Sequence, residues 1–171
     1  MKKTWILLFC STLSFASIEN IDTFKADFIQ TITDDKNVSL KYSGNLIAKK
    51  PQSALWNYIK PIEKNVYINK YSITIVEPEI EQVIIRKIET NFDFFMMMKN
   101  ATKIDKDRYI ANYKNTKFII STKDKLIESI SYKDEFENNV KIFFKNQKQG
   151  IKIDNDIFKA KYPLDFDIII D

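Results

Sequence analysis

Alternation of apolar and polar residues with a period of two runs through most of this chain and constrains its fold more than any other feature. Phe24, Ala26 and Phe28 share one parity, with Lys25 and Asp27 between them. Because successive side chains of a β-strand point to opposite faces, this pattern predicts strands with one apolar face. The predicted strands cover residues 24–32, 38–48, 55–59, 65–69, 72–76, 81–86, 108–113, 117–122, 126–132, 140–146 and 166–170.

Short polar or proline-containing turns separate many of these strands, for example Lys49-Lys50-Pro51, Lys60-Pro61 and Glu77-Pro78. Connections of two to five residues are typical of hairpins, which pair strands antiparallel. A meander of about ten or eleven strands must curl or close on itself. The sequence therefore predicts a mainly β domain built on one curved antiparallel sheet.

Two segments depart from the alternation. Residues 17–22 are compatible with a short helix, and residues 89–100 predict a second helix with Thr90 as a possible N-cap. The second segment is apolar at nearly every position, so it must contact apolar groups on more than one side. We expect it to act as a lid over the concave face of the sheet.

The first sixteen residues have the pattern of a cleaved secretory signal. Lys2 and Lys3 precede an apolar stretch, and Ser14-Phe15-Ala16 places small residues at the positions that signal peptidase requires, so we predict cleavage after Ala16. Acylation of Cys10 is disfavoured because bulky Phe9 precedes it. The sequence thus predicts a signal at residues 1–16, a single domain at residues 17–171, and export of that domain.

Composition argues against several function classes. Histidine is absent and glycine occurs only twice, which removes histidine-based catalysis and phosphate-binding glycine loops. The 27 basic and 23 acidic residues are interspersed, a pattern that argues against nucleic acid as a partner. Catalysis by paired carboxylates is the remaining possibility. The candidate pairs are Asp105 with Asp107 and Asp165 with Asp167, and both are better explained as polar residues of turns between strands. We predict no enzyme activity, no cofactor and no metal.

The apolar inventory instead points to a ligand site. Thirteen Phe, eight Tyr and two Trp are many aromatic residues for one domain. A curved sheet has a single concave face, and the predicted helices are too short to cover it, so an apolar trough should remain. Met96, Met97 and Met98 fit such a site because flexible thioether side chains adapt to varied apolar ligands.

Several short motifs follow one another in a recognisable order. They are Phe24-Lys25-Ala26-Asp27-Phe28-Ile29-Gln30, Ser43-Gly44-Asn45-Leu46, Lys49-Lys50-Pro51, Trp56, Pro61, Glu81-Gln82-Val83, and Phe158 with Tyr162-Pro163. In order and spacing they resemble the periplasmic outer-membrane lipoprotein carrier family (LolA) over nearly the whole chain after residue 16.

The resemblance implies an unclosed antiparallel half-barrel with a helical lid over an apolar cavity. It implies a monomeric carrier that accepts triacylated lipoproteins from an ATP-driven inner-membrane transporter and passes them to an outer-membrane acceptor. The alternatives are an anchored acceptor at the outer membrane and a lipoprotein-sensing module of the same fold. The residues expected to contact acyl chains are Phe28, Leu46, Trp56, Tyr58, Ile75, Phe92, Phe95, Met96, Met97, Ile130 and Phe144.

Two positions depart from the family pattern. The family has an arginine before the first proline that latches the lid, and Lys50 stands there in this chain. An ammonium group lacks the planar fork of a guanidinium, so a latch through Lys50 should be weaker or built differently. The family also carries a bulky aromatic residue at the transporter-facing lip, where this chain has Ala54.

Overall fold

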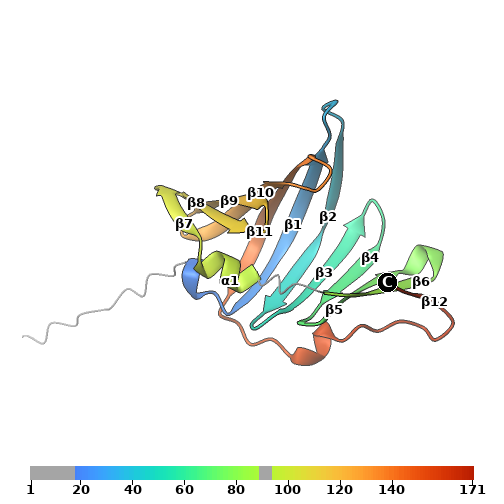
Figure 1. Ribbon diagram of the computed structural model, residues 1–171. Coiled ribbons are helices and arrows are strands. Elements are labelled where there is room, and N and C mark those ends of the chain that lie inside the picture. Colours follow the sequence, from blue (N-terminus) through green and yellow to red (C-terminus); the bar gives the residue numbers. More distant parts are fainter. Residues whose placement is uncertain (1–17, 89–93) are drawn as a thin grey trace, which may run out of the picture.

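The computed structural model describes residues 18–88 and 94–171 (Figure 1). Within these ranges the chain forms twelve strands, one α-helix and three short 3-10 helices. The strands are β1 (Thr23–Thr33), β2 (Ser39–Lys49), β3 (Ser53–Lys60), β4 (Lys64–Ile68), β5 (Ser72–Glu77), β6 (Gln82–Lys87), β7 (Thr102–Asp105), β8 (Arg108–Tyr113), β9 (Thr116–Lys123), β10 (Leu126–Lys133), β11 (Asn139–Gln149) and β12 (Asp167–Ile170). The helical segments are η1 (Ile18–Asn20), η2 (Pro78–Ile80), α1 (Phe94–Lys99) and η3 (Asn155–Phe158).

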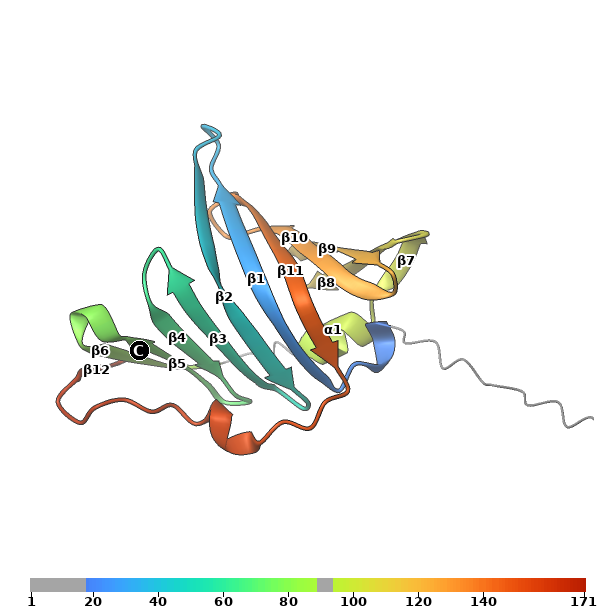
Figure 2. The same cartoon turned by 180° about the vertical axis from the view of Figure 1, so that it is seen from behind.

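The twelve strands of the described ranges form one sheet, in the order β12-β6-β5-β4-β3-β2-β1-β11-β10-β9-β8-β7. The long strands β1, β2 and β11 occupy the middle, and shorter strands extend to either side (Figures 1 and 2). Strands β12 and β7 are the two edges of the sheet and do not pair with each other. The curved sheet is therefore an unclosed half-barrel, as predicted.

Two details differ from the sequence-based expectation. Strand β7 was not predicted, because its four residues are all exposed and give no apolar alternation. Strand β12 pairs parallel with β6, with Asp167 opposite Gln82. The segment between Gln149 and Asp167 carries the chain from the end of β11 to the sheet edge beside β6, where β12 adds as the last strand (Figure 2).

The parity that faces inward follows from burial and register. Phe24, Ala26 and Phe28 of β1 are buried, and Ala26 lies opposite Leu46 of β2. Phe28 lies opposite Gly44, which in turn pairs with Tyr58 of β3. The apolar residues of the alternating pattern therefore line the concave face.

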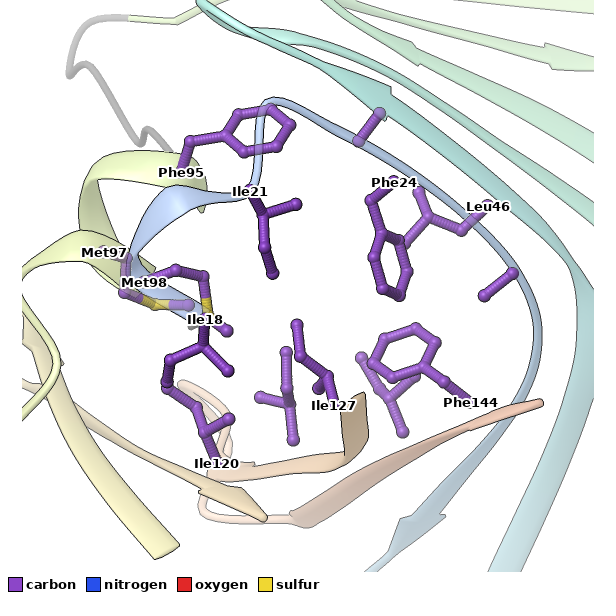
Figure 3. Close-up of a cluster of buried hydrophobic side chains, with 14 of the residues drawn as sticks. Ile18, Ile21, Phe24, Leu46, Phe95, Met97, Met98, Ile120, Ile127 and Phe144 are labelled. Atoms are coloured by element: carbon purple, nitrogen blue, oxygen red, sulfur yellow. The ribbon is translucent and has the colours of Figure 1, made fainter. Parts of the chain in front are cut away.

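Short helices cover one end of this concave face. Figure 3 shows side chains of α1 and η1, including Met98 and Ile18, directed toward Ile120 of β9 and Ile127 of β10. All four are buried and belong to the main apolar cluster. The predicted short helix at residues 17–22 corresponds to η1. The predicted helix at residues 89–100 is observed as α1, whereas Thr90 and Phe92 lie outside the described residues.

Polar contacts on the convex face hold the central strands and the C-terminal segment. The carboxylate of Asp27 accepts hydrogen bonds from the side-chain amides of Asn45 at 2.6 Å and Asn146 at 2.7 Å. The ammonium of Lys49 donates to the carbonyl oxygen of Ile153 at 2.9 Å. These bonds connect β2, β1 and β11 and tie the chain before η3 to β2.

Candidate functional site

An apolar cavity of about 430 Å³ lies on the concave face, between the two sides of the sheet and next to α1. Its volume is in the range of small-molecule sites, roughly 300–1,000 Å³. No lining residue carries a formal charge among those the structure describes. The lining residues are Gln30, Trp56, Tyr58, Val66, Ile68, Phe94, Met97, Tyr113, Phe118, Ile130, Tyr132, Ile142 and Phe144.

A second pocket of about 70 Å³ lies where α1 meets β2 and β3. Trp56, Ile68 and Phe94 line both this pocket and the larger cavity, so the two hollows share a wall. Ala54 also lines the small pocket, and its methyl group fills less space than an aromatic ring would. The absence of a bulky residue at position 54 thus helps to keep the space beside Phe95 open.

Most of the predicted acyl-contact residues gather around these two hollows. Trp56, Tyr58, Met97, Ile130 and Phe144 line the larger cavity, and Leu46, Trp56 and Phe95 line the smaller one. Phe28 is buried beneath this wall, with its ring centroid 5.0 Å from the centroids of both Trp56 and Tyr58.

Two predicted residues are placed elsewhere, and a third is not described. Ile75 is half-buried on β5 opposite cavity-lining Val66, and it lines neither hollow. The side chain of Met96 is 58% exposed, because the turn of α1 that buries Met97 directs the preceding residue to solvent. Phe92 lies outside the described residues.

Sequence reasoning missed several lining residues. Val66 and Ile68 pair with Trp56 and Ala54 across β3 and β4, so correct strand register would have found them. The others come from the central strand β1, from α1 and from strands β8 to β11: Gln30, Phe94, Tyr113, Phe118, Tyr132 and Ile142.

The polar groups of the cavity are neutral. The Tyr58 hydroxyl donates to Oε1 of Gln30 at 2.9 Å. Burial, with a smaller contribution from Tyr132 and Tyr42, raises the pKa of Tyr58 to about 12. Burial, and secondarily the charge of Asp134, also raises the pKa of Tyr132. Both phenols therefore remain protonated at neutral pH, and the wall stays compatible with uncharged ligands.

Lys50, the predicted latch, lies at the α1 end of the cavity. Its ammonium nitrogen forms an ion pair with Asp22 Oδ1 at 2.7 Å and lies 6.0 Å from the centroid of the Phe95 ring. Its backbone N–H also donates to the carbonyl oxygen of Asp22 at 2.9 Å. Lys50 therefore connects the segment before β1 with an aromatic face of α1.

The other candidate features do not form a comparable site. A hollow of about 970 Å³ near the β10–β11 turn is lined largely by charged and polar residues, which suit acyl chains poorly. Asp105 accepts hydrogen bonds from the Lys106 N–H at 2.6 Å and from Arg108 at 2.9 Å. These bonds, the first being the larger effect, lower the pKa of Asp105, which is exposed and remote from the cavity lining.

An unclosed β-sheet with an uncharged apolar cavity beside a short helix defines a class of half-barrel proteins with a hydrophobic binding site. Within that class, the chain belongs to the outer membrane lipoprotein carrier protein LolA family, whose model matches residues 19–119.

Curated relatives and solved structures agree with this assignment. An outer-membrane lipoprotein carrier protein from Campylobacter jejuni is 42% identical over 99% of each chain. One from Helicobacter pylori is 33% identical over 82% of this chain and 76% of that protein. A LolA superfamily protein from Nitrosomonas europaea has the same fold, with a TM-score of 0.51 at 8% identity over 82% of this chain and 91% of its own. No helix within residues 18–88 and 94–171 is long and apolar enough to cross a bilayer.

Proposed function

We propose that this protein is a periplasmic carrier that binds the acyl chains of lipoproteins released from the inner membrane and takes them to the outer membrane. The observation that carries the proposal is the 430 Å³ cavity, whose wall combines aromatic and aliphatic side chains with no formal charge among the described residues. The names of its curated relatives support the same role.

The physical need for such a carrier is large. At about 0.8 kcal/mol per methylene, a sixteen-carbon chain costs on the order of 12 kcal/mol to hold in water. Apolar burial is non-directional, so a cavity of this kind shields chains without requiring one fixed pose. A ligand held mainly by burial can also be passed to another apolar site, because no specific bond must first be broken.

In this proposal Trp56, Tyr58, Met97, Ile130 and Phe144 contact the chains directly. Leu46 and Phe95 accept them in the smaller pocket, and Phe28 supports the rings of Trp56 and Tyr58. Ile75 extends the apolar face beyond Val66, and Phe92 and Met96 belong to the lid segment. The carrier itself hydrolyses nothing.

The proposed partners are an ATP-driven lipoprotein-releasing transporter in the inner membrane and an acceptor at the outer membrane. We also propose that residues 1–16 are a signal removed on export, leaving residues 17–171 as a monomeric carrier. Mass spectrometry of the exported protein tests this: an N-terminus at Ser17 supports the carrier, and an acylated N-terminal cysteine would make it an anchored acceptor instead.

Release of lipoproteins tests the proposed function most directly. Residues 17–171 are added to cells stripped of their outer membrane, and newly made lipoproteins are measured in the supernatant. We expect acylated cargo to appear there in proportion to added carrier, and cargo whose acylated cysteine is replaced by serine to be absent from purified carrier complexes. Cargo that stays in the membrane at every carrier concentration would contradict the proposal.

The latch has its own test, because Lys50 contacts both Asp22 and the Phe95 ring. We expect Lys50→Leu to speed loss of bound cargo and Lys50→Arg to slow it, since a guanidinium stacks on an aromatic face more effectively. The ion pair is exposed, so the free energy of unfolding should change by less than about 1 kcal/mol. Equal dissociation rates in all three proteins would remove Lys50 from the mechanism.

A further inference from the structure

The two ends of the cavity differ in chemistry. Near α1 the wall is formed by Ala54 and its partner Ile68. Four residues further along the same two strands, Tyr58 lies opposite Lys64. At about 3.3 Å per residue, this second pair lies roughly 13 Å from the pair of Ala54 and Ile68. The turn between β3 and β4 places this second pair at the end of the sheet away from α1 (Figure 1).

Lys64 is held over aromatic rings at that far end. Its ammonium nitrogen lies 4.7 Å from the Tyr58 centroid and 5.7 Å from the Tyr42 centroid. The two rings meet edge to face, with centroids 5.9 Å apart, and Lys64 is half-buried. Aromatic faces attract a cation but offer its three N–H donors no strong acceptor.

Comparison with Lys50 shows which end of the cavity has an ammonium group that is not neutralised by a carboxylate. Lys50, at the α1 end, is paired with the carboxylate of Asp22 at 2.7 Å. Lys64 makes no ion pair with a carboxylate in the ranges 18–88 and 94–171. Gln30, which contacts the same tyrosine, accepts a hydrogen bond from the Tyr58 hydroxyl at 2.9 Å through its oxygen, and its amide nitrogen is a further donor.

We propose that Lys64 and Gln30, which both contact Tyr58, form a polar subsite that binds the ester and amide carbonyl oxygens at the head of the acylated cargo. The methyl ends of the chains then point toward α1, into the space lined by Phe94 and Phe95. The donors satisfy carbonyl groups that would otherwise lose hydrogen bonds to water on entering an apolar cavity. This inference rests on the proposed carrier function and adds to it the orientation of the cargo.

The test compares two triacylated lipopeptides that differ only at the glyceryl links, one with esters and one with ethers, which lack the carbonyl oxygens. We expect the protein to bind the ester form about tenfold more tightly, the effect of one hydrogen bond to a charged group. Lys64→Met should abolish this preference by weakening ester binding alone, and Lys64→Arg should retain it.

Lys70→Met is the matched control, because Lys70 also lies over a tyrosine ring, at 5.2 Å from the Tyr71 centroid, but Lys70 is exposed and Tyr71, unlike Tyr58, is not part of the cavity lining. It should keep the ester preference. Equal binding of both lipopeptides by the unmodified protein, or equal weakening of both by Lys64→Met, would overturn the subsite. If neither lipopeptide binds the unmodified protein, the carrier function itself fails.

Phospholipids carry the same glyceryl esters, so a competition experiment is needed to distinguish lipoproteins from phospholipids as the ligand. We expect phosphatidylethanolamine at an equal concentration to leave the ester lipopeptide bound, because it lacks the third, amide-linked chain. Displacement at equal concentration would overturn the assignment of the subsite to lipoproteins.

Discussion

Met97→Asp should reduce lipoprotein release by at least about 100-fold, whereas Met96→Asp should leave it within about twofold of the unmodified protein. The two residues are neighbours on α1, yet the side chain of Met97 is 7% exposed and lines the cavity, and that of Met96 is 58% exposed. A carboxylate at position 97 would meet acyl chains without a compensating cation in the lining. The same substitution at position 96 places the charge in water.

The pair of variants separates cargo binding from helix stability. Both substitutions replace methionine by aspartate in the same short helix, so their effects on helix propensity should be similar. Release from cells stripped of their outer membrane measures function, and urea unfolding measures stability. Equal loss of release in the two variants would show that α1 does not present Met97 to the cargo.

Phe95→Asp tests the same idea at the smaller pocket. Phe95 is 4% exposed and belongs to the main apolar cluster as well as to the small pocket. An aspartate there would lose core packing in addition to cargo contacts, and the cost of a buried unpaired charge is several kcal/mol. Met97 belongs to the same cluster, so both variants need the urea measurement, and Met97 is the more direct test because it lines the larger cavity.

The difference between Met96 and Met97 also shows where prediction from sequence reached its limit. A helix reveals its buried side through the spacing of polar residues, and the run Phe94–Met98 contains none. The sequence therefore did not indicate which side of α1 faces the core. It is set by tertiary packing, in which Met98 joins Ile18, Ile120 and Ile127 in the core.

The strands were more predictable because each carries its own alternation. Phe24, Ala26 and Phe28 share one parity on β1, and Leu46 and Ala48 share one on β2; the burial of these residues in the structure shows that this parity faces inward. The pairing of β1 with β11 joins residues more than a hundred positions apart, and no local pattern specifies it. From that distant side Ile130 and Phe144 were predicted as cavity residues, whereas Tyr132 and Ile142, on the same two strands, were not.

Gly44→Ala should be the most destabilising conservative change in the sheet. A Cβ atom built on Gly44 collides with the backbone carbonyl oxygen of Asn57 and lies 3.0 Å from Cα of Tyr58. Backbone atoms cannot rotate away as a flexible side chain can, so β2 and β3 must separate locally, next to the register shift between Ser43 and Gly44. We expect the free energy of unfolding to fall by about 3 kcal/mol or more.

Gly150→Ala is the control, since glycine occurs at only these two positions. Gly150 has φ of +64° with no atom within 4 Å of an added Cβ, so only the left-handed backbone conformation opposes alanine, at a cost of about 1 kcal/mol. Urea unfolding followed by fluorescence measures both variants. Trp56 is the only tryptophan after residue 16, and it lies in the cavity wall on the strand that Gly44 contacts. Gly44→Ala should therefore also shift the native emission of Trp56. A stability loss no larger than that of Gly150→Ala would show that β2 and β3 tolerate a side chain at position 44.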